Sequence, residues 1–89
     1  MPTAQQVLDE LIQIQQQVGR RQATPRLRAL LSYLRRSHPE VNIGSETAKG
    51  RAIIAISYLT EVHDRTGLVP ESVWADAIGR AREWASTEA

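Results

Sequence analysis

The sequence predicts an all-α protein, a compact bundle of four helices in one domain covering residues 1–89. Three observations predict it. Apolar residues recur at helical spacing in four successive segments, clusters of Gly, Pro, Ser and His separate those segments, and 89 residues suffice for one modest core. Connections of about four to eight residues favour antiparallel neighbours. The pattern leaves open an up-down or an orthogonal arrangement.

The first predicted helix covers residues 4–19. Thr3 is its N-cap and Gln6, three residues later, completes the pattern of a capping box. Gly19 is the expected end. The buried stripe consists of Val7, Leu11, Ile14 and Val18. Glutamines fill the opposite face, namely Gln5, Gln6, Gln13, Gln16 and Gln17.

The second predicted helix covers residues 25–37. Thr24 and Pro25 form a typical start, a capping hydroxyl followed by proline at the first helical position. His38 precedes Pro39 and is therefore biased away from helical geometry, which ends the helix. Its apolar stripe consists of Leu27, Leu30, Leu31 and Leu34.

The third predicted helix covers residues 45–64, with Ser45 as its cap and Gly67 just beyond its end. Ile53 and Ile54 spread apolar character around most of its circumference. A helix of this kind must be covered on nearly all sides. It is therefore either central in the fold or buried against another chain. The run 53–56 is rich in β-branched isoleucine but lies within a longer helical period, so no strand is predicted.

The fourth predicted helix covers residues 70–86 and opens with Pro70 and Glu71, which suit a first turn. Trp74 and Trp84 lie about 80° apart around its axis. We expect one of them in the core and the other partly exposed, where it covers the end of the bundle rather than anchors an interface. The residues predicted to form the core are Leu30, Leu34, Ile56, Leu59, Trp74 and Ile78.

The sequence offers little chemistry for catalysis. It has no cysteine, which excludes disulfides, thiolate nucleophiles and cysteine-ligated metals. Neither His38 nor His63 has a second histidine at helical spacing. Glu61 and Asp64 could join His63 around a cation, but we interpret this cluster as a solvated helix end. We therefore predict a protein that is not an enzyme, with no catalytic residue, no metal and no cofactor.

Charge is unevenly distributed although the net charge is only +1. Six arginines lie between residues 20 and 36 with no acid among them, an arrangement that could follow a nucleic-acid backbone. Acids elsewhere could instead pair with them, and Tyr33 is the only nearby aromatic. A helix-turn-helix over residues 62–76 fits poorly, because His63 and Asp76 fall on positions that require small or apolar residues.

These features predict a small helical module of bacterial or phage type that binds another protein, as inhibitors, immunity proteins, antitoxins and adaptors do. A homodimer is a further option. The candidate contact residues are Arg21, Arg28, Arg35, Arg36, Gln13, Gln16, Gln17 and Ile54. The alternative is a nucleic-acid-binding regulator that uses Arg20, Arg21, Arg26, Arg28, Arg35 and Arg36. Without a signal peptide or a long apolar run, the expected location is the cytoplasm, with no membrane partner.

Overall fold

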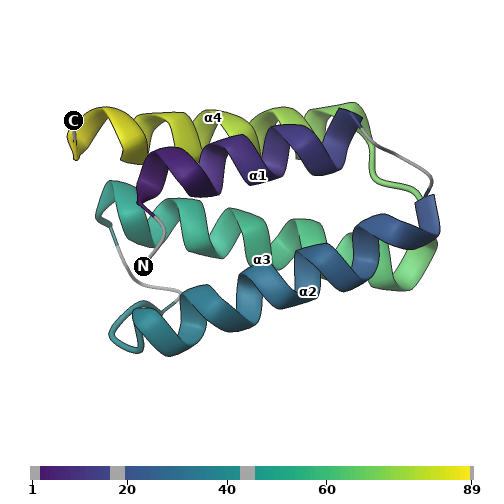
Figure 1. Ribbon diagram of the computed structural model, residues 1–89, viewed down its shortest axis with the longest axis horizontal. Coiled ribbons are helices and arrows are strands. Elements are labelled where there is room, and N and C mark those ends of the chain that lie inside the picture. The colour runs from purple at the N-terminus through teal and green to yellow at the C-terminus, as the bar shows by residue number, and fades with distance from the viewer. Residues whose placement is uncertain (1–2, 17–19, 43–45, 89) are drawn as a thin grey trace.

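A computed structural model of the chain describes residues 3–16, 20–42 and 46–88, and gives only the backbone for residues 20–24. Its elements are α1 (Ala4–Gln16), α2 (Arg20–Ser37), α3 (Ala48–Thr66) and α4 (Glu71–Thr87). No strand is present in these ranges. The predicted all-α fold class with four helices is thus confirmed (Figure 1).

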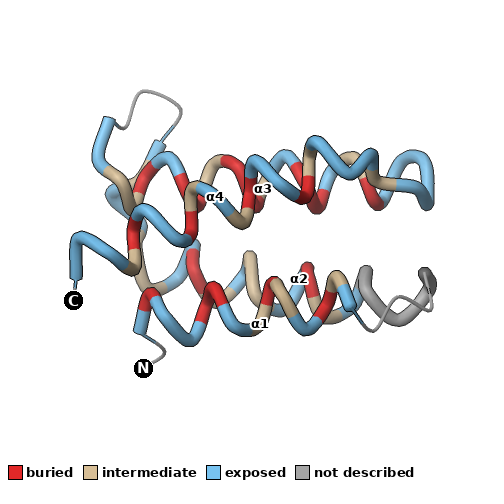
Figure 2. Tube along the Cα trace, turned by 90° about the horizontal axis from the view of Figure 1, so that it is seen from above, coloured by how far each residue is buried: buried red, intermediate tan, exposed pale blue. Residues whose placement is uncertain are grey.

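The four helices form an up-down bundle rather than an orthogonal array. Successive helices run in opposite directions, and both chain ends lie at the same end of the molecule (Figure 1). α1 packs on α2 and α4, and α3 packs on the same two helices, which closes a ring of four. The view from above shows the α1–α2 pair beside the α3–α4 pair (Figure 2). The molecule measures 31 × 24 × 23 Å.

The core runs the length of the bundle and is built from one face of each helix. Four of the six predicted core residues, Leu34, Ile56, Leu59 and Trp74, are buried. The other two, Leu30 and Ile78, are half-buried and pack against the core from its margin. Further buried aliphatic side chains come from α1 and α2, namely Val7, Leu8, Leu11, Ile14 and Leu27.

Both tryptophans are buried, which corrects the expectation that one would be partly exposed. Trp74 is 6% exposed and Trp84 is 3% exposed. A core-facing stripe on a helix is about 100° wide or more, so two side chains about 80° apart both fit within it. Trp84 closes the end of the bundle, where its indole N–H donates to Glu88 Oε1 at 2.6 Å.

The predicted start of α1 is confirmed, whereas α3 begins later than predicted. Thr3 and Gln6 form the expected capping box: Thr3 N–H donates to Gln6 Oε1 at 2.8 Å and Gln6 N–H donates to Thr3 Oγ1 at 3.2 Å. α3 begins at Ala48, later than predicted, because Thr47 is its N-cap and accepts from Gly50 N–H at 3.0 Å. The predicted cap Ser45 lies outside the described residues.

The prediction that α2 begins at Pro25 is wrong. The helix begins at Arg20, and Pro25 lies inside it. Proline has no N–H and cannot donate to the carbonyl four residues earlier. The missing bond falls near the N-terminus, where the preceding residues, mostly good helix formers, can still extend the helix by one turn.

The helix ends agree with the sequence signals where they are described. α2 stops at Ser37 before the His38–Pro39 pair. Gly67 ends α3 in the left-handed conformation with φ of 67°, and its N–H donates to His63 O at 3.0 Å. The predicted end of α1 at Gly19 lies outside the described residues. None of the described helices has the length and apolarity needed to cross a membrane.

Candidate functional site

A surface groove of 580 Å³ runs between the C-terminal part of α2 and the outer face of α3. α2 ends at Ser37, and the residues that follow it border the groove beside α3. The groove is lined by Arg35, His38, Pro39, Val41, Asn42, Ile53, Ile54, Ser57, Tyr58 and Glu61. Two of the predicted contact residues, Arg35 and Ile54, therefore belong to one site.

The apolar part of the groove comes from α3. Ile53 is 4% exposed and Ile54 is half-buried. Tyr58, one turn further along, is 57% exposed. Among the described residues only Tyr58 and Leu68 are large hydrophobic side chains that are exposed, and Tyr58 lies in the groove. Such a ring offers a ready apolar contact.

A cation without a carboxylate partner lies at the α2 side of the groove. Arg35 Nη2 donates to Ser57 Oγ at 2.9 Å, which holds the guanidinium across the groove toward α3. No ion pair joins Arg35 to an acid within the described part of the chain. The groove's own acid, Glu61, pairs instead with Arg65 at 2.6 Å. Arg35 is thus available to a carboxylate from outside.

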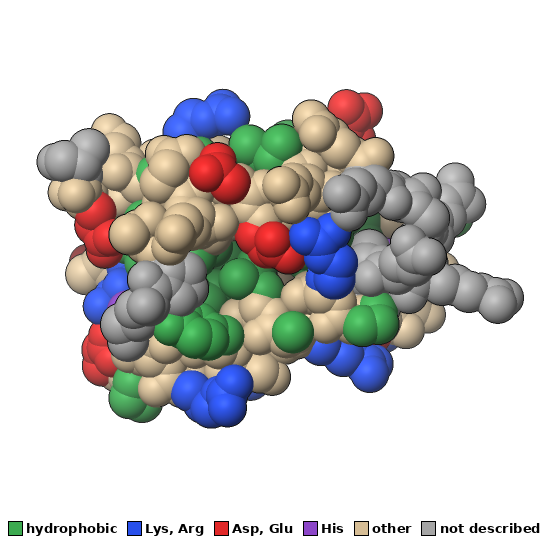
Figure 3. Space-filling model, viewed as in Figure 1, with side chains coloured by type: hydrophobic (Ala, Val, Ile, Leu, Met, Phe, Trp, Pro, Cys, Tyr) green, Lys and Arg blue, Asp and Glu red, His purple; other side chains and the backbone are tan. Residues whose placement is uncertain are grey.

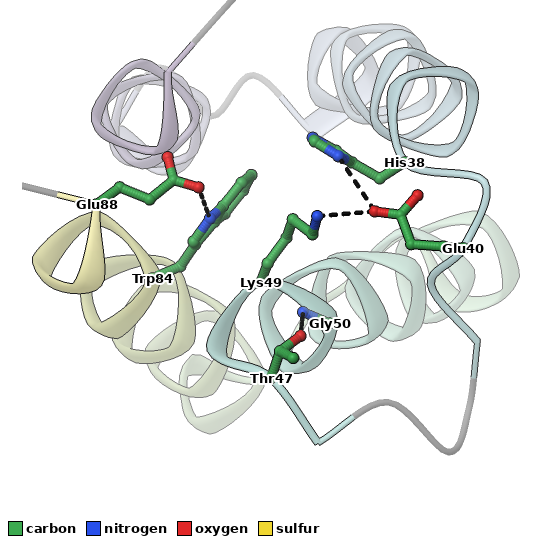
Figure 4. Close-up of polar contacts among 7 residues, drawn as sticks. All are labelled: His38, Glu40, Thr47, Lys49, Gly50, Trp84 and Glu88. Atoms are coloured by element: carbon green, nitrogen blue, oxygen red, sulfur yellow. Dashed lines mark hydrogen bonds and ion pairs between the residues drawn. The ribbon is translucent and has the colours of Figure 1, made fainter.

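A polar network at the end of the bundle fixes the segment that borders the groove (Figure 4). Lys49 Nζ lies 2.7 Å from Glu40 Oε1, and His38 Nδ1 lies 3.7 Å from the same oxygen. The hydrogen bond from Lys49 holds the pKa of Glu40 below its usual value, and backbone hydrogen bonding adds to this. The His38 ring meets Trp84 edge-on at a centroid distance of 5.9 Å.

The arginines predicted as a basic surface are dispersed among acids. Arg26 Nη2 lies 2.8 Å from Glu10 Oε1, and Arg28 Nη2 lies 3.0 Å from Asp64 Oδ1. Both contacts confirm that acids elsewhere in the chain pair with this segment. Figure 3 accordingly shows basic and acidic side chains interspersed on the face in view.

The remaining arginines of the segment differ in whether the structure describes their side chains and whether these have a carboxylate partner. Arg36 is exposed, with no ion pair to any described residue. Arg20 and Arg21 begin α2, but their side chains lie outside the described part of the structure. Arg35 and Arg36 are therefore the described arginines of this segment that lack a carboxylate partner.

The glutamine face of α1 does not join the groove. Gln13 and Gln16 are exposed, and Arg26 Nη2 donates to Gln13 Oε1 at 3.4 Å. Arg26 lies about 14 Å from Arg35 along the axis of α2. Gln17 is outside the described residues. The predicted contact residues thus divide between two regions of the bundle.

The interpretation of His63 as part of a solvated helix end is wrong, since His63 is 5% exposed. It follows Ile56 and Leu59 at seven and four residues, so it continues their buried stripe. Its neighbours are engaged elsewhere, Asp64 with Arg28 and Glu61 with Arg65. Within the described ranges, no group of three or more acids and histidines could hold a metal ion.

Tyr58 is the site residue that the sequence analysis missed. Its signal was present: it lies four residues after Ile54, on the side of α3 opposite the Ile56–Leu59 stripe. A cation, a phenol and aliphatic carbon in one groove can bind a polypeptide segment by burial and ion pairing.

Comparison with known protein families, curated proteins and solved structures gives no match to this chain.

Proposed function

We propose that the protein is a small, non-enzymatic interaction module that binds another polypeptide in the α2–α3 groove. One observation carries the proposal: Tyr58, 57% exposed, shares a groove with half-buried Ile54 and with Arg35, whose only described partner is a serine hydroxyl. Tyrosine and arginine are among the residue types that most often dominate binding energy at protein interfaces. An inhibitor, antitoxin or adaptor of the cytoplasm would act in this way.

The groove also indicates the chemistry of its occupant. An aliphatic or aromatic side chain would cover Ile54 and the Tyr58 ring, removing apolar surface from water. A carboxylate beside it would pair with Arg35, whose guanidinium can donate two parallel hydrogen bonds. We therefore expect a helical or extended segment with an apolar residue next to an acid.

Capture from cells that express the protein tests this function. The immobilised full chain is compared with Arg35→Glu and Tyr58→Ala, which change the groove, and with Arg82→Glu as the matched control. Arg82 is exposed on α4 and has no ion pair to any described residue. We expect a protein that is retained by the wild type and by Arg82→Glu but lost from both groove variants. Retention that ignores the groove variants would contradict the proposal.

Nucleic acid is the alternative partner, supported by the six arginines of residues 20–36. Two of them, Arg26 and Arg28, already pair with acids, which lowers the local positive field. If this alternative holds, the captured material is sensitive to nuclease. Its binding then falls steeply with salt, and Arg36→Gln lowers the slope of log K against log salt by about one. Circular dichroism and thermal unfolding of every variant exclude misfolding as the cause of lost binding.

A further inference from the structure

We propose that the occupant of the α2–α3 groove is a second copy of this chain, with the two α3 helices packed antiparallel. The inference rests on the proposed function, because it names the partner of the same groove. Its basis is a self-complementary stripe on the outer face of α3, which we call the α3 stripe. It consists of Arg51, Ile54, Tyr58 and Glu61.

The α3 stripe lies on one side of the helix and faces away from the core. Its residues are spaced by three, four and three, which keeps them on one helical face. The side chains of Arg51 and Glu61, at the two ends of the stripe, are 44% and 55% exposed. Ile54 is half-buried and Tyr58 is 57% exposed. An apolar centre is thus flanked by one positive and one negative end.

The spacing of the α3 stripe reads the same in both directions. When a second α3 runs antiparallel, with a two-fold axis that crosses the outer face at the level of residue 56 along the helix, Arg51 faces Glu61 of the second copy and Ile54 faces its Tyr58. A two-fold axis generates each contact twice, as required of a symmetric dimer. A parallel pairing in register would place Arg51 against Arg51 and Glu61 against Glu61. The charges therefore favour the antiparallel orientation.

The groove of each copy is the site where the exposed Tyr58 ring of the other copy would bind. Tyr58 of one copy would enter the groove of the other beside Ile54, where it loses contact with water. Arg35 borders the same space, so in this dimer its guanidinium would meet the face of the ring rather than a carboxylate. The same contact forms a second time across the axis. Tyr58, which enters the groove of the other copy, and Ile54, beside which the ring of the other copy packs, lie one turn apart on α3.

The end charges are free to change partners on association. Arg51 Nη1 lies 3.5 Å from Glu83 Oε1, a long contact between exposed side chains. Glu61 pairs with Arg65, which is 75% exposed, in an i,i+4 contact. Exposed pairs of this kind are weak, so giving them up costs little. The stripe spans about 15 Å of helix, a small interface. We therefore expect a dissociation constant in the micromolar range.

Sedimentation equilibrium of the full chain at low salt, from low micromolar to several hundred micromolar, tests the proposal. We expect the mass to rise from monomer toward dimer. Arg51→Glu and Glu61→Arg should each weaken association by about tenfold, because each places like charges at both ends of the stripe. An equimolar mixture of the two variants should associate again, since the substituted positions then face each other with opposite charge.

Tyr58→Asp should abolish the dimer, whereas Leu68→Ala should leave it unchanged. Leu68 is the matched control, because it has the same 57% exposure but lies outside the groove. A chain that stays monomeric at every concentration would overturn the proposal, as would a dimer indifferent to Tyr58→Asp. So would a mixture that associates no better than its components. If the chain is monomeric but still captures a different protein through the groove, only the identity of the partner is wrong.

Discussion

Leu59 and Tyr58 are adjacent in sequence but meet opposite environments, which makes them a matched pair for a test of the core. Leu59 is fully buried, at 0% exposure, and Tyr58 is 57% exposed. Leu59→Ala should lower the free energy of unfolding by about 2–5 kcal/mol, because it removes buried carbon and leaves a cavity. Tyr58→Ala should change it by less than about 0.5 kcal/mol. Urea unfolding at low protein concentration, where the chain is monomeric, measures both.

Glu40 gives the bundle end a dependence on pH. Its pKa lies below the ordinary value of 4.5, chiefly because of the hydrogen bond from Lys49. A carboxyl group with a lowered folded-state pKa contributes stability above the unfolded pKa, and this contribution disappears as pH falls through the folded value. We expect the thermal unfolding midpoint of the wild type to fall more steeply between about pH 5 and pH 3 than the midpoint of Glu40→Gln.

The wild type should also be the more stable of the two at neutral pH, with the difference vanishing in acid. Lys49→Met provides the control, since it removes the main cause of the lowered pKa while keeping the carboxyl. On the acidic side, the thermal midpoint of Lys49→Met should depend on pH nearly as weakly as the midpoint of Glu40→Gln. Parallel profiles for the wild type and Glu40→Gln would show that this carboxyl does not couple folding to pH.

At the scale of one element, α3 depends on the residues at its two ends. Thr47 Oγ1 accepts from Gly50 N–H at the start, and Gly67 takes φ of 67° at the finish. Thr47→Ala should lower the free energy of unfolding by about 0.5–2 kcal/mol, because it leaves a helix N–H without its partner. Thr47→Ser, which keeps the hydroxyl, should cost far less. Urea midpoints of the three proteins decide this, and an equal loss for Ala and Ser would exclude capping as the cause.

The ends of the four helices show what the sequence could predict. The capping box at Thr3 and the left-handed residue Gly67 are local signals, and both were confirmed. The start of α2 was not predictable in this way. Thr24 and Pro25 form a good local start signal, but a helix can continue through proline near its N-terminus when only one hydrogen bond is lost. Local pattern therefore located the helices better than their boundaries.

At the scale of the whole molecule, the candidate site required information that the sequence does not contain. Arg35 and Ser57 are 22 residues apart and meet only because α2 and α3 pack in one particular register. The buried stripes predict that these helices pack together, yet register depends on side-chain fit in three dimensions. For the same reason the ion pairs of Arg26 and Arg28 could be expected as a class but not assigned to Glu10 and Asp64.

Association through the α3 stripe would couple the stability of the whole bundle to protein concentration. A dimer that forms only from folded chains withdraws them from the unfolding equilibrium, so the apparent stability rises with the ratio of protein concentration to the dissociation constant. We expect the thermal midpoint of the wild type to rise between low micromolar and several hundred micromolar protein. The midpoint of Tyr58→Asp should stay constant over the same range. The comparison is internal to each protein, so a small intrinsic effect of the substitution does not disturb it. If both proteins show the same rise, self-association is real but uses another surface, and the outer face of α3 would then need a different occupant.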